Sequence, residues 1–287
     1  MIRLSVNVLT SAIELLRRLN TYRYSSVSEL AYSKIVSISA EDIFDFASKC
    51  GWANKTENIL LVTSRGVGLL FLYEEGRASE LKRQMLMDYV LRAAPIWSNR
   101  IPYGRKEATI FMSKDETACF SDAGLLSDQL DSDIIDWWDT IANQIRLQTQ
   151  QEKNDTGRTG ERNTIKYEKM RTNIMPKWMA VDSNLLGYDI KSVLSKDDHS
   201  SLLIEVKSSM LSIHQASFHI TAHEWEVALT NDAYVFHLWS FWRNKRLLAV
   251  ISPHDVQPYI PTNNLGGEWE STKIPFACFE NRFVEIE

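Results

Sequence analysis

The segment from Ser201 to Ser208, with the sequence SLLIEVKS, limits what this chain can fold into more than any other stretch. Side chains alternate along a β-strand, so its even-numbered apolar residues share one face, while Glu205 and Lys207 share the other. Those two charged residues then lie about 7 Å apart at the backbone. The segment therefore predicts a sheet with a covered face and a carboxylate beside an amine.

Four more strand-like segments follow residue 176, at 178–181, 187–194, 233–239 and 247–251. The first half of the chain instead shows helical periodicity. It predicts helices at 6–20 and 79–94, and a third helix that is capped by Ser37 or Ser39 and ends at Gly51. We therefore predict an α/β fold. Its C-terminal part is a mixed sheet flanked by helices, and a mainly helical region precedes it.

Residues 58–71 leave two local structures open. They form either two strands around a tight turn or a strand followed by the start of a helix. Helices followed by a short β element resemble a winged-helix module, and this resemblance covers about a quarter of the chain. The module contacts either DNA or a protein partner, and the cations available for phosphate contact are Arg17, Arg18, Arg23 and Arg65.

A shift in composition divides the chain near residue 152. A helix predicted over 131–151 carries Trp137 and Trp138, which are expected in a core or interface, and the sequence then turns polar from Gln148 to Thr159. A separate polar helix is predicted through about Arg171. The predicted division is a winged-helix-like module at 1–75, a helical connection at 76–152 and a nuclease-like domain at 153–287.

Charge and cysteine content exclude several classes of protein. The 37 acidic residues outnumber the 32 basic ones, for a net charge of −5, which disfavours a protein that coats nucleic acid non-specifically. Cys50, Cys119 and Cys278 are too far apart for a C-x-x-C metal pair or a disulfide framework. No apolar run is long enough to span a membrane. We expect a cytoplasmic protein without a membrane partner.

Glu161, Asp189, Glu205 and Lys207 are the candidate catalytic residues. Glu161 lies on the polar helix, Asp189 on the strand-like segment before Glu205, and Lys207 two residues after Glu205. Mg²⁺ prefers carboxylate and water oxygens, so Asp189, Glu205 and Glu161 are the predicted metal ligands. Lys207 then orients or deprotonates an attacking water, or stabilises developing negative charge. The chemistry indicated is phosphodiester hydrolysis.

These residues resemble the PD-(D/E)XK nuclease superfamily. The elements of the resemblance are Gly157-x-x-Gly160-Glu161, Gly187-Tyr188-Asp189-Ile190, Ile204-Glu205-Val206-Lys207-Ser208 and Phe218-x-Ile220-Thr221-x-x-Glu224-Trp225-x-x-Ala228. Within that superfamily, residues 153–245 look like the domain named after the C-terminal region of the plant protein NO VEIN. The resemblance implies a restriction-endonuclease-like core that carries Glu161, Asp189, Glu205 and Lys207.

The resemblance implies a Mg²⁺-dependent DNA endonuclease of a bacterial restriction or antiviral defence system, with Mn²⁺ as a substitute metal. Two other functions stay open. One is a non-catalytic DNA- or protein-binding subunit of a larger defence assembly, and the other is a winged-helix transcription regulator. A homodimer or a partner defence subunit is compatible with each of them.

Two further features of this half bear on binding. Arg158, Arg162, Lys166 and Lys169 are predicted to contact nucleic acid, because they add a basic excess to the Glu161 helix; a solvated helix face explains them equally well. Thr221 and Glu224 have the spacing of a helix capping box, so capping is favoured over a place for Glu224 beside the metal.

Overall fold

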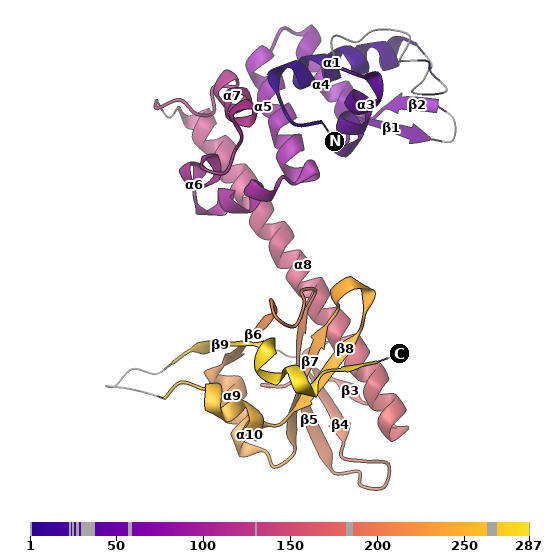
Figure 1. The fold of residues 1–287 in the computed structure, drawn as a ribbon, viewed down its shortest axis with the longest axis vertical. Helices are drawn as coiled ribbons and strands as arrows, with labels where there is room; N and C mark the ends of the chain where they lie inside the picture. Colours follow the sequence, from indigo (N-terminus) through magenta and orange to yellow (C-terminus); the bar gives the residue numbers. More distant parts are fainter. Residues whose placement is uncertain are drawn as a thin grey trace. The chain divides into compact units, whose positions relative to one another are not determined.

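The computed structural model describes residues 2–22, 24, 26, 29, 38–56, 59–129, 131–181, 186–262 and 269–286 (Figure 1). The chain forms two compact units, Met1–Thr149 and Gln150–Glu287. The finer three-part division at residues 75 and 152 remains a prediction. None of the helices in the described ranges combines the length and the apolar character needed to cross a membrane.

The N-terminal unit begins with two amphipathic helices, α1 (Val6–Thr21) and α3 (Ala40–Lys49). The stripe of α1 that includes Leu9 is buried, as its spacing predicts. Ser39 caps α3, because its side chain accepts a hydrogen bond from Asp42 N at 3.1 Å. Ser37, the other predicted cap, and Arg23, one of the predicted phosphate-contacting cations, lie outside the described residues.

A short antiparallel hairpin, β1 (Ala53–Thr56) and β2 (Ile59–Val62), precedes helix α4 (Ser64–Glu74). Of the two structures left open by the sequence, the strand followed by a helix is therefore correct. Thr63 caps α4 by accepting a hydrogen bond from Gly66 N at 3.2 Å. Gly66 is needed there, because a Cβ would lie 2.3 Å from the carbonyl oxygen of Trp52. The assignment of this region as a winged helix remains a prediction.

The helix predicted over 79–94 is regular only in part. It forms α5 (Ala78–Asp88) and then a π-helical turn, Tyr89–Ala93, which ends at Ala94 with a left-handed φ of 45°. The 3₁₀ segment Ile96–Tyr103, α6 (Arg105–Thr109) and α7 (Lys114–Asp122) follow. Trp137 and Trp138 pack against Phe120 in the core, as expected for core residues.

Helix α8 (Ser132–Thr172) is one continuous helix of 41 residues, so the predicted end near residue 151 is wrong. The intervening residues are polar, but Gln, Glu and Lys have high helix propensity, and an isolated glycine costs only about 1 kcal/mol in a helix. Polarity at 148–159 therefore marks exposure of the helix rather than its end. Gly157 and Gly160 are both inside it.

The C-terminal unit is built on a six-stranded mixed sheet in the order β10-β8-β7-β5-β4-β3. Strands β5 and β7 are parallel, and the other neighbours are antiparallel. The strands are β3 (Lys177–Trp178), β4 (Ile190–Val193), β5 (Ser201–Ser209), β7 (Tyr234–Ser240), β8 (Leu247–Ile251) and β10 (Val284–Glu285). This architecture confirms the predicted fold class.

The two faces of the sheet carry separate apolar clusters. On one face, α8 packs over Ile204, Val206 and Trp239, and Trp239 Nε1 donates a hydrogen bond to Thr164 Oγ1 at 2.7 Å. The other face packs against α9 (Ala222–Thr230), α10 (Pro253–Val256) and the ribbon of β6 (Ser217–Thr221) with β9 (Ser271–Pro275) (Figure 1). Charged residues placed between these layers are therefore shielded from water.

Candidate functional site

Glu205 and Lys207 lie side by side on β5, as the alternation of the strand predicts. Lys207 Nζ is 2.8 Å from Glu205 Oε1. Both side chains are largely enclosed, with 7% of Glu205 and 15% of Lys207 exposed. A buried carboxylate and a buried ammonium group therefore form the centre of the candidate site.

Asp189 joins this pair from the residue that precedes β4. Its Oδ2 atom accepts a hydrogen bond at 2.9 Å from the backbone N–H of Val206, the residue between Glu205 and Lys207. This bond holds the carboxylate against β5. Gly187, two residues before Asp189, lies close against α9. It has a left-handed φ of 73°, and a Cβ on it would lie 2.7 Å from Val227 Cγ2.

Glu224, at the start of α9, is the fourth charged residue of the cluster. Its Oε2 atom accepts a hydrogen bond from Thr221 N at 2.7 Å and completes the expected capping box. Its Oε1 atom is 2.8 Å from Lys207 Nζ. The sequence favoured the cap over a place beside the metal; the structure confirms the cap and adds the contact with Lys207. We call Asp189, Glu205, Lys207 and Glu224 the carboxylate–lysine cluster.

Burial and mutual charge set the protonation of this cluster. Burial raises the pKa of Asp189 to about 6, and the neighbouring charge of Glu161 adds to this effect. Burial also raises the pKa of Glu205 well above its ordinary value, although Lys207 opposes the rise. Burial alone would raise the pKa of Glu224, but the charge of Lys207 and the hydrogen bonds to Glu205, Lys207 and Thr221 together outweigh it, and the pKa is lowered.

Lys207 remains charged in this environment. Burial would lower its pKa, but the charges of Glu205 and Glu224 more than offset that effect and raise the pKa above its ordinary value. Three carboxylates thus share one ammonium group when all are ionised. The unbalanced negative charge is relieved by protons on Asp189 and Glu205 or by a cation.

Glu161 is placed differently from the other three predicted residues. It lies on α8, where Arg158 Nη1 is 2.9 Å from its Oε2 and Trp178 Nε1 also donates to that oxygen. Gly160, the residue before Glu161, lets α8 lie close to β5, because a Cβ at this position would be 1.8 Å from Ser208 Oγ. Glu161 therefore approaches from the face covered by α8, whereas Glu205 and Lys207 point to the other face.

The three-carboxylate metal site expected from the sequence is not assembled in this arrangement. Across the described ranges, no three His, Cys, Asp or Glu side chains are grouped so that they could hold a metal ion together. Mg²⁺ is usually bound through only one or two carboxylates and keeps several waters. Asp189 and Glu205 meet that requirement. They are close together and buried, and the negative charges of the cluster outnumber its single positive charge.

The four predicted nucleic-acid-binding residues separate into two groups. Arg158 is engaged within the protein, by Glu161 and by stacking of its guanidinium 5.5 Å from the Trp178 ring centre. Arg162, Lys166 and Lys169 are exposed and recur at spacings of four and three, so they line one face of α8. These three remain candidates for contact with phosphates.

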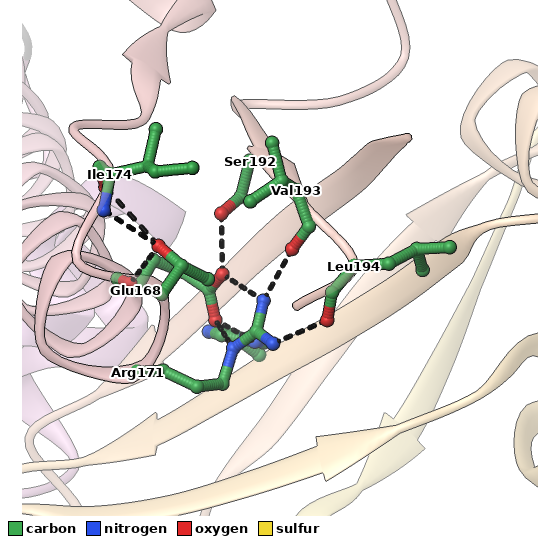
Figure 2. Close-up of polar contacts among 8 residues, drawn as sticks. Glu168, Arg171, Ile174, Ser192, Val193 and Leu194 are labelled. Carbon is green, nitrogen blue, oxygen red and sulfur yellow. Dashed lines mark hydrogen bonds and ion pairs between the residues drawn. The ribbon is translucent and has the colours of Figure 1, made fainter. Parts of the chain in front are cut away.

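A second buried polar group, centred on Glu168 of α8, escaped the sequence reasoning (Figure 2). Glu168 accepts a hydrogen bond from Ser192 Oγ at 2.5 Å and pairs with Arg171 at 2.6 Å. Arg171 also donates to the carbonyl oxygens of Val193 and Leu194. The group thereby ties α8 to β4, the strand that begins just after Asp189. Its only sequence signal is the helical spacing that aligns Glu168 with Gly160.

Comparison with known proteins bears on this half of the chain. Residues 160–250 match the family model described as Protein NO VEIN, C-terminal. The matched segment holds Glu161 and all four residues of the carboxylate–lysine cluster, and it confirms the resemblance to this family over less than half of the chain. No curated protein and no solved structure matches the chain.

Proposed function

We propose that the C-terminal unit is a Mg²⁺-dependent endodeoxyribonuclease of the PD-(D/E)XK type, acting in a bacterial restriction or antiviral defence system. The observation that carries the proposal is the convergence of Asp189, Glu205 and Lys207 within a segment that matches the NO VEIN C-terminal family. These are the three side chains that the superfamily motif requires. Asp189 comes from the residue just before β4, and Glu205 and Lys207 come from the neighbouring strand β5.

Asp189 and Glu205 are the proposed ligands of Mg²⁺, with Mn²⁺ as a substitute. When bound, the metal would polarise a phosphodiester group and lower the pKa of water in the site. Because both carboxylates have raised pKa values, loading a cation would release protons from them. Metal affinity should therefore rise between about pH 5 and pH 7.

Lys207 supplies a fixed positive charge in this proposal. Of the roles that the sequence left open, we favour electrostatic stabilisation over general base, because a raised pKa keeps the amine protonated near neutral pH. An ammonium group held by Glu205 and Glu224 can instead orient the attacking water and stabilise the negative charge that develops on the phosphate. Glu224 acts as the positioning partner of Lys207.

Exposed cations of α8 are the proposed contacts to the DNA backbone. Arg162, Lys166 and Lys169 face solvent on the helix that also carries Glu161. Contacts of this kind neutralise phosphates without reading the base sequence. They fit a substrate held by its backbone.

Cleavage of supercoiled plasmid by the full chain, with Mg²⁺ or Mn²⁺, tests the proposal. The native protein should cut, and Lys207→Ala and Asp189→Asn should each cut at least about 100-fold more slowly. Lys191→Ala is the matched control, because Lys191 is an exposed lysine of the neighbouring strand β4. Thermal unfolding of each variant would verify that it is folded. A Lys207→Ala protein that cuts as fast as its parent would show that the proposed active site is wrong.

A non-catalytic DNA- or protein-binding subunit is the second candidate. It is favoured by the partners that the acidic residues already have: Lys207 bridges Glu205 and Glu224, and Arg158 and Trp178 hold Glu161. The two functions differ in their response to Mg²⁺. Binding of DNA with equal affinity in Mg²⁺ and in EDTA, without cutting of modified or unmodified DNA, would support the binding subunit.

A further inference from the structure

The N-terminal unit contains a polar pocket of about 510 Å³ that has no part in the proposed nuclease chemistry. Three cationic side chains, Lys49, Arg65 and Arg92, line it against one carboxylate, Asp88. In a chain with a net charge of −5, this concentration of positive charge is a local exception. Lys49 belongs to α3 and Arg65 to α4, whereas Asp88 ends α5 and Arg92 lies in the π-helical turn that follows.

Asp88 forms a rigid floor for the pocket. It is 2% exposed, and its Oδ2 atom accepts a hydrogen bond from Trp52 Nε1 at 2.9 Å. Its Oδ1 atom accepts from Arg65 Nη1 at 3.1 Å and from Gln84 Nε2 at 3.2 Å. These bonds use only part of the donor capacity of Arg65, because a guanidinium carries five N–H groups. The Arg65 side chain is 48% exposed, so its other N–H groups are accessible to a ligand.

Lys49 and Arg92 complete the positive lining of the pocket. Within the described ranges, neither side chain takes part in an ion pair or a hydrogen bond. Arg92 lies against Gly51, where a Cβ would be 3.1 Å from its Nη1 atom. It belongs to the π-helical turn that ends at left-handed Ala94, and such turns are frequent at functional sites.

We propose that this pocket binds a nucleoside triphosphate. Three cations around one pocket suit a ligand with several negative charges, and arginine forks match phosphate geometry. The volume lies within the roughly 300–1,000 Å³ that small-molecule sites occupy, and is too small for a nucleic-acid duplex. Met87 and Leu91 offer an apolar wall for a base, beside the amides of Gln144 and Gln148.

Nearby carboxylates define the side on which the phosphates lie. Asp42 and Asp45 line an adjoining pocket together with Lys49 and Arg92. Their negative charges disfavour an anion on the α3 side. The triphosphate is therefore placed toward Arg65, with Lys49 and Arg92 between the two pockets. This assignment does not depend on the nuclease proposal.

Calorimetric titration of the full chain with ATP and GTP tests the inference, with adenosine and inorganic phosphate as reference ligands. At least one triphosphate should bind, and adenosine should bind about 100-fold more weakly because it lacks the phosphates. Inorganic phosphate should also bind more weakly than the triphosphate, since it does not reach the apolar wall. Arg92→Gln and Lys49→Gln should each weaken triphosphate binding about tenfold.

Lys55→Gln is the matched control, because Lys55 is an exposed lysine of β1 outside the pocket. It should leave the affinity within about twofold of the parent. The inference would be overturned if neither triphosphate bound, or if the two pocket variants bound as tightly as the parent. It would also be overturned if a single-stranded oligonucleotide were the tighter ligand of this pocket, since the cations would then belong to a nucleic-acid interface.

Discussion

Replacing Asp189 by asparagine removes one negative charge from the carboxylate–lysine cluster and changes little else. The asparagine side chain retains an oxygen that can accept the hydrogen bond from Val206 N, now made to Oδ2 of Asp189 at 2.9 Å. The side chains have nearly the same volume, so packing against β5 is preserved. We expect this variant to lose cleavage and to gain stability in the absence of a divalent cation.

The size of the gain follows from the pKa of Asp189. Burial raises that pKa from 3.8 to about 6, so the folded chain binds this proton more tightly than the unfolded chain does. The resulting contribution to stability is complete below about pH 4 and is lost as the pH rises through 6. At about 1.36 kcal/mol per pKa unit, ionised Asp189 costs the folded protein about 3 kcal/mol near pH 7.5.

Urea titration monitored by hydrogen exchange of the β5 and β7 amides would measure this difference in the C-terminal unit alone. Asp189→Asn should raise the free energy of opening by about 2 to 3 kcal/mol near pH 7.5, and the difference should shrink toward zero near pH 4. Added Mg²⁺ should stabilise the parent and leave the variant nearly unchanged, because the cation offsets the charge that the variant lacks.

Asp232→Asn is the matched control, since Asp232 is an exposed carboxylate just before β7. It should change stability by less than about 0.5 kcal/mol at either pH. The argument is that burial disfavours the ionised form of Asp189. It would be refuted if Asp189→Asn were no more stable than its parent near neutral pH, or if the gain were the same near pH 4.

Three further predictions concern α8. Gly160→Ala should destabilise the chain by about 1 to 3 kcal/mol through the clash with Ser208, whereas Gly157→Ala, which meets nothing within 4 Å, should stabilise it by about 0.5 to 1 kcal/mol; thermal unfolding measures both. Arg171→Met should cost about 3 to 5 kcal/mol by leaving the buried charge of Glu168 unpaired, and most of this loss should return when Glu168→Gln is added. Changing the three exposed cations of α8 to glutamine should reduce the salt dependence of DNA binding, lowering the slope of log K against log salt by about 2 to 3; an unchanged slope would exclude them as phosphate contacts.

The parts of the fold that could be predicted are those that local pattern determines. Alternation along 201–208 placed Glu205 and Lys207 on one face of a strand, and β5 has that arrangement. A serine ahead of an apolar stripe, Ser37 or Ser39, indicated the cap of α3, and Ser39 caps it. In each instance the deciding interaction joins residues close together in the sequence.

Tertiary packing decided the features that the sequence could not show. A polar run was interpreted as a break between helices, whereas α8 passes through it unbroken. Glu161 was grouped with Asp189 and Glu205; its charge does act on Asp189, but it lies on α8 and is held by Arg158 and Trp178, partners that the sequence did not indicate. Glu168 carries a charge that usually signals exposure, and only its neighbours Ser192 and Arg171 explain its burial.

The carboxylate–lysine cluster also has a consequence for the order of folding. Asp189 lies 17 residues before its partner Val206, and Glu224 lies 17 residues after Lys207. Two short chain closures around β5 therefore bring the cluster together, and closures of this length carry a modest entropy cost. Contacts of short sequence separation form among the earliest in a folding chain. The chemistry of the site is thus encoded in one contiguous stretch, which can assemble before β8, β9 and β10 add to it.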